Sequence, residues 1–280
     1  MEIEGKVAIV TGAGAGIGAA LAEAISMHKA RLVIVADIDG DKALAVAEKI
    51  GGISFQTDVS NENEVQAMVT SIENKYGPIG LFCSNAGFVT SAGLEDANER
   101  IQKMWDVHVM SHIYAARSVL PQMIANGEGY LLNTASAAGL LTQIGSLSYS
   151  ITKSAAVSLA EWISITHHHQ GIRVSVLCPQ AVRTDILTNS PDNHEGDNPE
   201  WEEGGVASSD GIIEPESVAE ICMEAINEER FLILPHQQVQ GYIEFKAQNP
   251  DKWLAGMRTF QNRLFIDEPL PGDAMNDFTG

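Results

Sequence analysis

A tyrosine and a lysine one helical turn apart, Tyr149 and Lys153, are the residues of this sequence best suited to acid–base chemistry. Residues at positions i and i+4 share one face of a helix, so a phenol and an ammonium group can meet at one point. A fixed neighbouring cation stabilises the phenolate and lowers the pKa of the phenol from about 10. The pair therefore predicts a tyrosine that exchanges a proton near neutral pH. An isolated pair of this kind is also common on solvated helix faces, so its surroundings decide.

Ser136 stands thirteen residues before Tyr149, directly after the apolar run 129–135, where a strand is expected to end. A serine at such a place is often a cap or turn residue. Its hydroxyl can also donate a hydrogen bond to a substrate oxygen while the tyrosine exchanges the proton. Small residues follow Tyr149 and suit a tightly packed helix. Together, Ser136, Tyr149 and Lys153 predict hydride transfer between an alcohol and a carbonyl compound.

A glycine-rich loop, Thr11-Gly-Ala-Gly-Ala-Gly-Ile-Gly18, connects an apolar strand pattern at 6–10 to an apolar-faced helix pattern at 17–27. Glycines at such a junction let the backbone turn sharply and approach a pyrophosphate. The N–H groups and the dipole of the helix N-terminus then hold the phosphates. This role is assigned to Gly12, Gly16 and Gly18.

Asp37 ends the next strand pattern, 31–36, nineteen residues after Gly18. A carboxylate at that point accepts hydrogen bonds from the adenosine ribose hydroxyls and repels a 2′-phosphate. The alternative is an ordinary turn aspartate. Lys42 is the nearest following cation, too far along the chain to suggest phosphate recognition. The sequence therefore predicts NAD rather than NADP.

Six motifs in this order resemble the short-chain dehydrogenase/reductase family, in its compact single-domain NAD-dependent branch, over roughly the first two-thirds of the chain. They lie at 11–18, 58–59, 85–87, 136, 149–153 and 179–184. The resemblance implies that Lys153 also contacts the nicotinamide ribose, and that Val182 and Thr184 hold the carboxamide. The cofactor-binding residues that it implies are Gly12, Gly16, Ile17, Gly18, Asp37, Ile38, Asp58, Val59, Asn85, Ala86, Gly87, Tyr149, Lys153, Pro179, Val182 and Thr184.

Three features depart from the family pattern. His108 occupies the position of an asparagine that, in the family, helps seat a water between the lysine and solvent. Histidine can bridge a water through either ring nitrogen, so His108 is a candidate for the catalytic set; the alternative is that it packs and bonds locally, and both stay open. Gln180 replaces the glycine that usually follows the proline at 179. The chain ends in an extension, 236–280, in place of the family's usual C-terminal sequence.

The composition favours one domain spanning 1–280. With 280 residues and 45% hydrophobic content, the chain can bury one large core. The breaker-rich segment 185–213, with Trp201, is interpreted as a substrate loop or lid; a disordered acidic loop is the alternative for its central part. A net charge of −20 argues against nucleic acid and anionic membranes as partners.

Cellular location is inferred from the cysteines and the apolar runs. Cys83, Cys178 and Cys222 are an odd number at wide spacing, so reduced thiols are expected. The N-terminus begins a strand almost at once, which leaves no room for a signal peptide, and no apolar run approaches the ~20 residues of a membrane helix. We therefore predict a cytoplasmic protein. The consecutive His167, His168 and His169 point in different directions on a helix and are not expected to share a metal ion.

The alternation of strand and helix patterns predicts an α/β fold with a doubly wound parallel sheet, a Rossmann fold with helices on both faces. Ligands bind such sheets beyond the carboxyl ends of the strands, where the strand order reverses. The glycine loop, Asn85 and Ser136 all follow strand ends. The predicted strands are 6–11, 31–37, 53–58, 79–84, 129–135, 172–178 and 231–234.

The predicted reaction is the reversible oxidation of a hydrophobic secondary alcohol by NAD, with Tyr149 as the acid/base. The alternatives are an NAD-binding sensor and an isomerase or dehydratase that uses tightly bound NAD. The resemblance also implies a homo-oligomer, a tetramer or a dimer. By analogy with family positions, the substrate pocket comprises Phe88, Val89, Leu140, Leu141, Gln143 and Ile144. In the extension, Trp253, Met257, Phe260 and Phe265 are interpreted as covering that pocket or a subunit interface, or as the packing face of an amphipathic helix.

Overall fold

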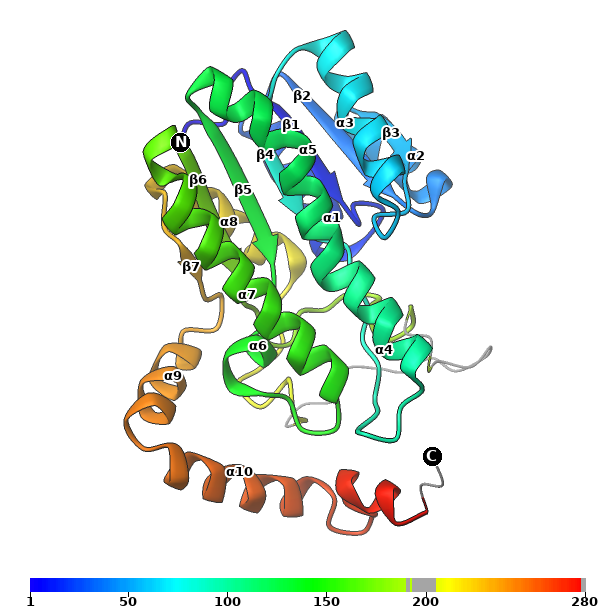
Figure 1. Cartoon of the computed structure of the whole chain (residues 1–280), viewed down its shortest axis with the longest axis vertical. Coiled ribbons are helices and arrows are strands. Elements are labelled where there is room, and N and C mark those ends of the chain that lie inside the picture. Colours follow the sequence, from blue (N-terminus) through cyan, green and yellow to red (C-terminus); the bar gives the residue numbers. More distant parts are fainter. Residues whose placement is uncertain (190–191, 193–204, 278–280) are drawn as a thin grey trace.

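A computed structural model describes residues 1–189, 192 and 205–277 of the chain. These residues form a seven-stranded, all-parallel sheet with the strand order β3-β2-β1-β4-β5-β6-β7 (Figure 1). The predicted α/β fold, with a doubly wound parallel sheet of seven strands, is therefore confirmed. The strands are β1 (Val7–Thr11), β2 (Leu32–Asp37), β3 (Ile53–Gln56), β4 (Ile79–Ser84), β5 (Gly129–Thr134), β6 (Ile172–Leu177) and β7 (Leu232–Ile233).

Helices cover both faces of the sheet, and each face has its own apolar core. Alternate residues of β1 point to opposite faces, Ala8 and Val10 into one core and Val7 and Ile9 into the other. Because both faces are covered, the strands are apolar throughout, as is typical of parallel sheets. One face carries α1 (Gly16–Met27), α2 (Gly40–Ile50) and α8 (Pro215–Glu228). The other carries α3 (Glu62–Tyr76), α5 (Ser111–Asn126) and α7 (Leu147–His167).

Local signals set several helix ends. The Asp39 carboxylate accepts hydrogen bonds from the backbone N–H groups of Asp41 and Lys42 and so caps the N-terminus of α2. Gly51, at a φ of 67°, ends the same helix in the left-handed conformation. The triple-histidine segment ends α7: η2 (His168–Gln170) is a short 3₁₀ turn that Gly171 closes at a φ of 85°.

The strand order reverses between β1 and β4, which lie side by side although two strands separate them in sequence. This reversal opens a crevice at the carboxyl ends of both strands. Three short elements surround that end of the sheet: α4 (Asn98–Trp105), the π-helical turn η1 (Asp106–Met110) and α6 (Ala137–Leu141). The glycine loop, Asn85 and Ser136 all open onto this edge.

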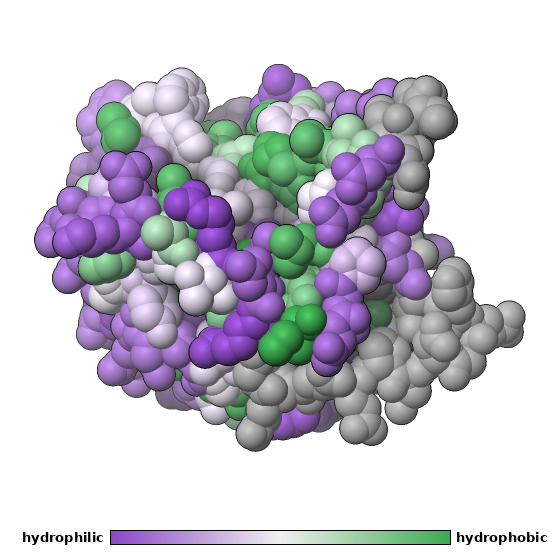
Figure 2. Space-filling model, turned by 90° about the horizontal axis from the view of Figure 1, so that it is seen from below, coloured by the Kyte–Doolittle hydropathy of each residue, from purple (hydrophilic) through white to green (hydrophobic). Residues whose placement is uncertain are grey.

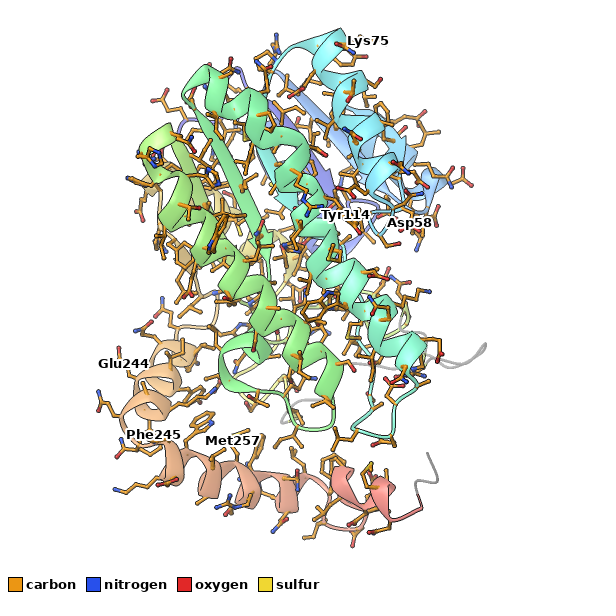
Figure 3. All side chains as sticks on the ribbon, viewed as in Figure 1. Asp58, Lys75, Tyr114, Glu244, Phe245 and Met257 are labelled. Atoms are coloured by element: carbon orange, nitrogen blue, oxygen red, sulfur yellow. The ribbon has the colours of Figure 1, made fainter. Side chains whose placement is uncertain are left out.

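The C-terminal extension lies beyond the same end of the sheet (Figure 1). It comprises α9 (Gln238–Gln248), α10 (Pro250–Leu264) and the 3₁₀ segment η3 (Pro271–Asp277). None of the residues of α10 is fully buried. Figure 3 shows Met257 on the side of α10 that faces the rest of the molecule. No helix of the described residues is both long and apolar enough to span a bilayer.

Candidate active site

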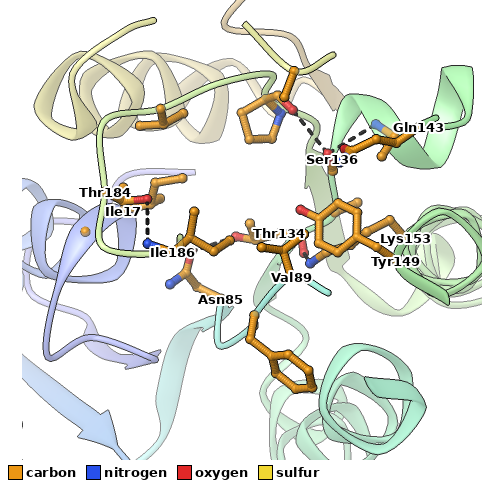
Figure 4. Close-up of a pocket in the computed structure, with 18 of the residues that line it drawn as sticks. Ile17, Asn85, Val89, Thr134, Ser136, Gln143, Tyr149, Lys153, Thr184 and Ile186 are labelled. Atoms are coloured by element: carbon orange, nitrogen blue, oxygen red, sulfur yellow. Dashed lines mark hydrogen bonds between the residues drawn. The ribbon is translucent and has the colours of Figure 1, made fainter. Parts of the chain in front are cut away.

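A cleft of about 950 Å³ lies at the carboxyl ends of the strands. Its lining includes residues of the glycine loop, the ends of β2, β4 and β5, the start of α7, and α10 of the extension. Segments that are far apart in sequence therefore meet in one continuous cavity. Figure 4 shows part of this lining, with Ser136 and Tyr149 on one side and Ile17 and Thr184 on the other.

The glycine loop packs too closely against its neighbours for side chains at two of the three assigned positions. Gly12 has a φ of +60°, and a Cβ there would lie 2.6 Å from Cα of Ala86. A Cβ on Gly18 would overlap the carbonyl oxygen of Gly12. Gly16 has a φ of +53° and faces Thr184, whose Cγ2 would be 3.0 Å from an added Cβ. The structure thus brings the loop together with the segments 85–87 and 179–184.

The loop fits a dinucleotide pyrophosphate. α1 begins at Gly16, and no side chain of the described residues caps its first N–H groups. Gly12, Gly16 and Ile17 line the cleft beside this helix end. Backbone N–H groups and the helix dipole at such a bare N-terminus are suited to bind phosphate oxygens.

The carboxylate of Asp37 lies at one end of the cleft, held by two backbone N–H groups. Its Oδ2 accepts a hydrogen bond from Gly14 at 2.8 Å, and its Oδ1 accepts one from Asp39 at 3.0 Å. These bonds fix the carboxylate at the carboxyl end of β2 and leave lone pairs for further donors. Lys42 lines the same end. The other predicted adenosine-side residues, Ile38, Asp58 and Val59, also line the cleft.

Asn85 ties three strands together at the reversal point. Its Nδ2 donates to the carbonyl oxygens of Thr11 and Gly12 at 3.2 and 3.3 Å. Its Oδ1 accepts a hydrogen bond from the hydroxyl of Thr134 at 3.1 Å. The side chain therefore positions the cleft floor where β1, β4 and β5 end. Ala86 and Gly87, the other residues of this predicted motif, line the cleft beside it.

Ser136, Tyr149 and Lys153 converge on that floor. The Ser136 hydroxyl caps α6 by accepting from the Ala138 N–H at 3.1 Å, and it donates to the Pro179 carbonyl at 3.3 Å. Lys153 Nζ donates to the carbonyl oxygen of Thr134 at 3.1 Å and lies 5.5 Å from the centroid of the Tyr149 ring. The lysine side chain is only 3% exposed. Figure 4 shows Ser136, Tyr149 and Lys153 grouped on one side of the cleft.

The protein interior shifts the pKa values of this group. Burial lowers the pKa of Lys153 to about 8, because the ammonium loses solvation. Burial raises the pKa of Tyr149, and a hydrogen bond from Ser136 partly opposes that rise. This direction is opposite to the lowering that the sequence predicts. The Tyr149 ring packs among Met104 and Ala138, and in that apolar cluster the cost of a phenolate exceeds the stabilisation that the nearby polar groups provide.

Thr134 was not assigned any role from the sequence. Its hydroxyl donates to Asn85 and its carbonyl oxygen accepts from Lys153, so it joins the central-strand motif to the predicted catalytic lysine. A polar residue at the end of an otherwise apolar strand was the available signal. It is weak, because threonine is also a common strand residue.

His108 lies in the π-helical turn η1, fully buried beneath the cleft. Its Nε2 accepts a hydrogen bond from the Phe88 N–H at 3.1 Å, so the ring proton is assigned to Nδ1. Nδ1 lies 3.0 Å from the hydroxyl of Thr152, which in turn donates to Ser148. Burial, followed by the charge of Lys153, holds the pKa of His108 well below 6.5. Protein groups therefore occupy both ring nitrogens, an arrangement that favours local bonding; a part in a water relay stays a prediction.

The predicted nicotinamide segment forms one wall of the cleft. Pro179, Val182 and Thr184 all line it. Backbone hydrogen bonds from Ala181 to Ala207 and from Arg183 to Ile213 join this segment to the end of the predicted lid. Of the predicted lid 185–213, residues 190–191 and 193–204, including Trp201, lie outside the described residues.

Comparison with known proteins settles the family. A sequence profile of the short chain dehydrogenase family matches residues 6–195. The chain belongs to this family. The family comprises oxidoreductases, so the predicted resemblance and the general dehydrogenase class are confirmed.

Several known proteins are similar to this short-chain dehydrogenase over most of its length. The 1-deoxy-11-beta-hydroxypentalenate dehydrogenase of Streptomyces exfoliatus is 28% identical over 90% of each chain. Estradiol 17-beta-dehydrogenase 11 of Homo sapiens is 28% identical over 88% of this chain and 86% of its own. A short-chain dehydrogenase/reductase from Burkholderia phymatum, solved in complex with NAD, is 29% identical; the match covers 90% of this chain and 96% of that chain, with a TM-score of 0.80.

The substrate end of the cleft differs in part from its prediction. Phe88, Val89, Leu141 and Gln143 line the cleft as expected. Leu140 and Ile144 are not part of the lining, so that part of the prediction is wrong. Leu140 packs against the sheet core and toward the extension instead. The α6 helix ends at Leu141, and the next residue, Thr142, has a φ of +70°. This turn determines which side chains face the cavity.

The C-terminal extension contributes a second wall of the short-chain dehydrogenase cleft. Trp253, Met257 and Phe260 line the cavity, whereas Phe265 does not. Figure 2 views the molecule from below and shows apolar side chains gathered within the lower face, with hydrophilic ones around them. The structure therefore favours the interpretation that Trp253, Met257 and Phe260 cover the pocket.

Proposed function

We propose that this short-chain dehydrogenase interconverts a hydrophobic secondary alcohol and its ketone with NAD. The observation that carries the proposal is the convergence of Ser136, Tyr149 and Lys153 at the floor of a cleft whose opposite end is a bare helix N-terminus. That arrangement supports the proposal, because one cavity would then offer a phenol for proton exchange, a hydroxyl to bond the substrate oxygen and a helix end to bind phosphates. The names of the Streptomyces and human relatives, both dehydrogenases of hydroxyl-bearing carbon skeletons, support the same reaction.

The chain's own residues account for the proton transfer. In oxidation, the Tyr149 phenolate takes the proton of the substrate hydroxyl, and the Ser136 hydroxyl donates a hydrogen bond to the substrate oxygen. The Lys153 ammonium, held by the Thr134 carbonyl, would oppose the rise that burial causes in the pKa of Tyr149. In reduction, Tyr149 donates the proton. When bound, NAD⁺ supplies the hydride acceptor and a positive charge close to the phenol.

The choice of NAD over NADP rests on Asp37. Its fixed carboxylate would accept hydrogen bonds from ribose hydroxyls and would repel a 2′-phosphate. Lys42 at the same end could attract a phosphate, so the two cofactors need a direct comparison. The Burkholderia structure with NAD supports NAD. A higher kcat/KM with NADP⁺ than with NAD⁺ would overturn this part of the proposal.

The proposal is tested with a panel of secondary alcohols, cyclic, aromatic and steroidal, with either cofactor and NADH or NADPH absorbance as the readout. Tyr149→Phe is expected to lose about 10²-fold or more in turnover, the scale of general acid–base catalysis, and to keep its affinity for NADH. Ile151→Ala, an exposed change on the same helix, is the control and is expected to stay active. Full activity of Tyr149→Phe would refute the assignment. Copurified NAD without net NADH formation would favour the isomerase or dehydratase alternative.

A further inference from the structure

The α10 helix presents one face to the cleft. Trp253, Met257, Phe260 and Arg263 all line the cavity, at spacings of four, three and three residues. Side chains at such spacings lie along one side of an α-helix. From Trp253 to Arg263 the helix rises about 15 Å, so this face covers a long part of the cavity wall. The wall is apolar except at its last position, Arg263.

Arg263 is a cation on an otherwise apolar surface. Its guanidinium carbon lies 5.1 Å from the centroid of the Phe260 ring, which holds the head group beside the cavity. No carboxylate of the described residues forms an ion pair with Arg263. The chain has 37 acidic and 17 basic residues, so acidic partners are abundant. Five other arginines do pair with carboxylates, Arg100, Arg117, Arg173, Arg183 and Arg230, whereas Arg31 and Arg258 form no ion pair among the described residues. Of the three arginines without an ion pair there, Arg263 is the one that lines the cleft.

A second cation lines the same cavity from another element. Lys103, on α4, contributes to the lining and forms no ion pair with the described residues. The charged residues of the cleft lining are four cations, Lys42, Lys103, Lys153 and Arg263, and four carboxylates, Asp37, Asp39, Asp58 and Asp185. The lining is therefore balanced in charge, whereas the protein as a whole has a net charge of −20. An apolar cavity with cationic groups in its lining fits a ligand that has a hydrocarbon body and an anionic end.

We propose that Arg263 binds a carboxylate on the alcohol substrate, with the hydrocarbon body of the substrate between that carboxylate and the carbon that is oxidised. The inference rests on the proposed function and narrows its substrate class to hydrophobic hydroxy acids. The planar guanidinium fork matches a carboxylate with two parallel hydrogen bonds, a geometry that lysine cannot offer. Arg263 is therefore a specificity-determining residue supplied by the C-terminal extension, and Lys103 adds a less directional attraction.

The test compares hydroxy acids with their methyl esters, because esterification removes the charge and keeps the hydrocarbon body. Lithocholate and ricinoleate, each beside its methyl ester, are assayed with NAD⁺ together with uncharged secondary alcohols. The wild-type enzyme is expected to show a KM for at least one acid about tenfold below that of its ester. Because Arg263 is exposed, salt should weaken this preference.

Arg263→Gln is expected to raise the KM for the acid about tenfold with little change in kcat, and to leave the ester unaffected. Arg263→Lys should recover part of the loss. The matched control is Arg258→Gln, on the same helix but outside the cleft lining, which should leave the acid and its ester unchanged.

The outcomes separate the two proposals. Oxidation of uncharged alcohols without a preference for either acid would overturn the role of Arg263 and leave the proposed reaction standing. An equal effect of Arg263→Gln on acid and ester would also overturn it, because that variant would then act through packing alone. If no alcohol of any kind yields NADH or NADPH, the proposed function itself fails.

Discussion

His112 makes the stability of this dehydrogenase sensitive to acid. This residue lies on α5, four residues after His108. Its side chain is 2% exposed, and neither ring nitrogen has a hydrogen-bond partner among the described residues. Burial, followed by the positive charge of Lys153, lowers the pKa of His112 from 6.5 to about 3. In the unfolded chain the imidazole takes up a proton as the pH falls through 6.5, whereas in the folded protein it stays neutral.

The sign and size follow from this difference. Between the two pKa values the unfolded state binds more protons, so the free energy of unfolding falls as the pH falls. Each full pH unit contributes about 1.4 kcal/mol, and the unfolded imidazole is half protonated at pH 6.5, so His112 alone should remove about 2 kcal/mol between pH 6.5 and 4.5. The pKa of His108 is lowered in the same sense, and that residue adds a parallel loss.

His112→Leu tests this reasoning by urea unfolding at a series of pH values between 4.5 and 7.5. The variant replaces a buried, unpaired polar ring with an apolar side chain, so we expect it to be at least as stable as the wild type at neutral pH. As the pH falls, the free energy of unfolding of the variant should decrease less steeply than that of the wild type, by about 1.4 kcal/mol per pH unit. His169→Leu changes an exposed histidine on η2 and should keep the wild-type slope. A wild-type slope in His112→Leu would refute the low pKa and the linkage built on it.

Two further variants test the local contacts of His108 and Gly18. His108→Phe should lower the free energy of unfolding by about 1–3 kcal/mol, because it leaves the partly buried Phe88 N–H unpaired and removes the contact with Thr152. Equilibrium unfolding measures this change, and a change below about 0.5 kcal/mol would contradict it. Gly18→Ala should weaken NADH binding at least tenfold in a fluorescence titration, because the added Cβ overlaps the Gly12 carbonyl oxygen. Its control, Gly241→Ala on α9, has open space around the new methyl group, and equal affinities in the two variants would contradict this account.

Local signals made most of the fold and the core of the site predictable. The strands are continuous apolar runs because both sheet faces are covered, and the seven predicted strands lie within about two residues of the observed ones. The glycine loop is readable because Gly12 and Gly18 are required by close backbone contacts. The position of Ser136 is predictable because it directly follows a strand pattern. The positions of Tyr149 and Lys153 are predictable because their spacing is one helical turn.

Properties that depend on tertiary packing were not predictable in the same way. The pKa of Tyr149 depends on its apolar neighbours, which come from other elements, and its direction was therefore predicted wrongly. The exclusion of Leu140 from the cleft depends on the short α6 helix and its turn at Thr142. The role of α10 depends on where the chain places it, because an amphipathic spacing alone does not specify what the apolar face covers.

Two of the departures from the family pattern, Gln180 and the C-terminal extension, are connected in space. The backbone N–H of Gln180, in the position of the usual glycine, donates to Nδ1 of His236 at the start of the extension, at 3.2 Å. Within the extension, the Tyr242 hydroxyl donates to Asp210 at 2.9 Å, and Lys246 donates to the Leu140 carbonyl on α6 at 2.6 Å. These bonds attach α9 and the residues just before it to three walls of the cleft: the 179–184 segment, the end of the lid segment and α6. Because α9 leads directly into α10, these bonds also fix the helix that carries Arg263. The extension therefore supports the walls of the candidate site, and a change in its anchoring should act on substrate binding before it acts on proton transfer.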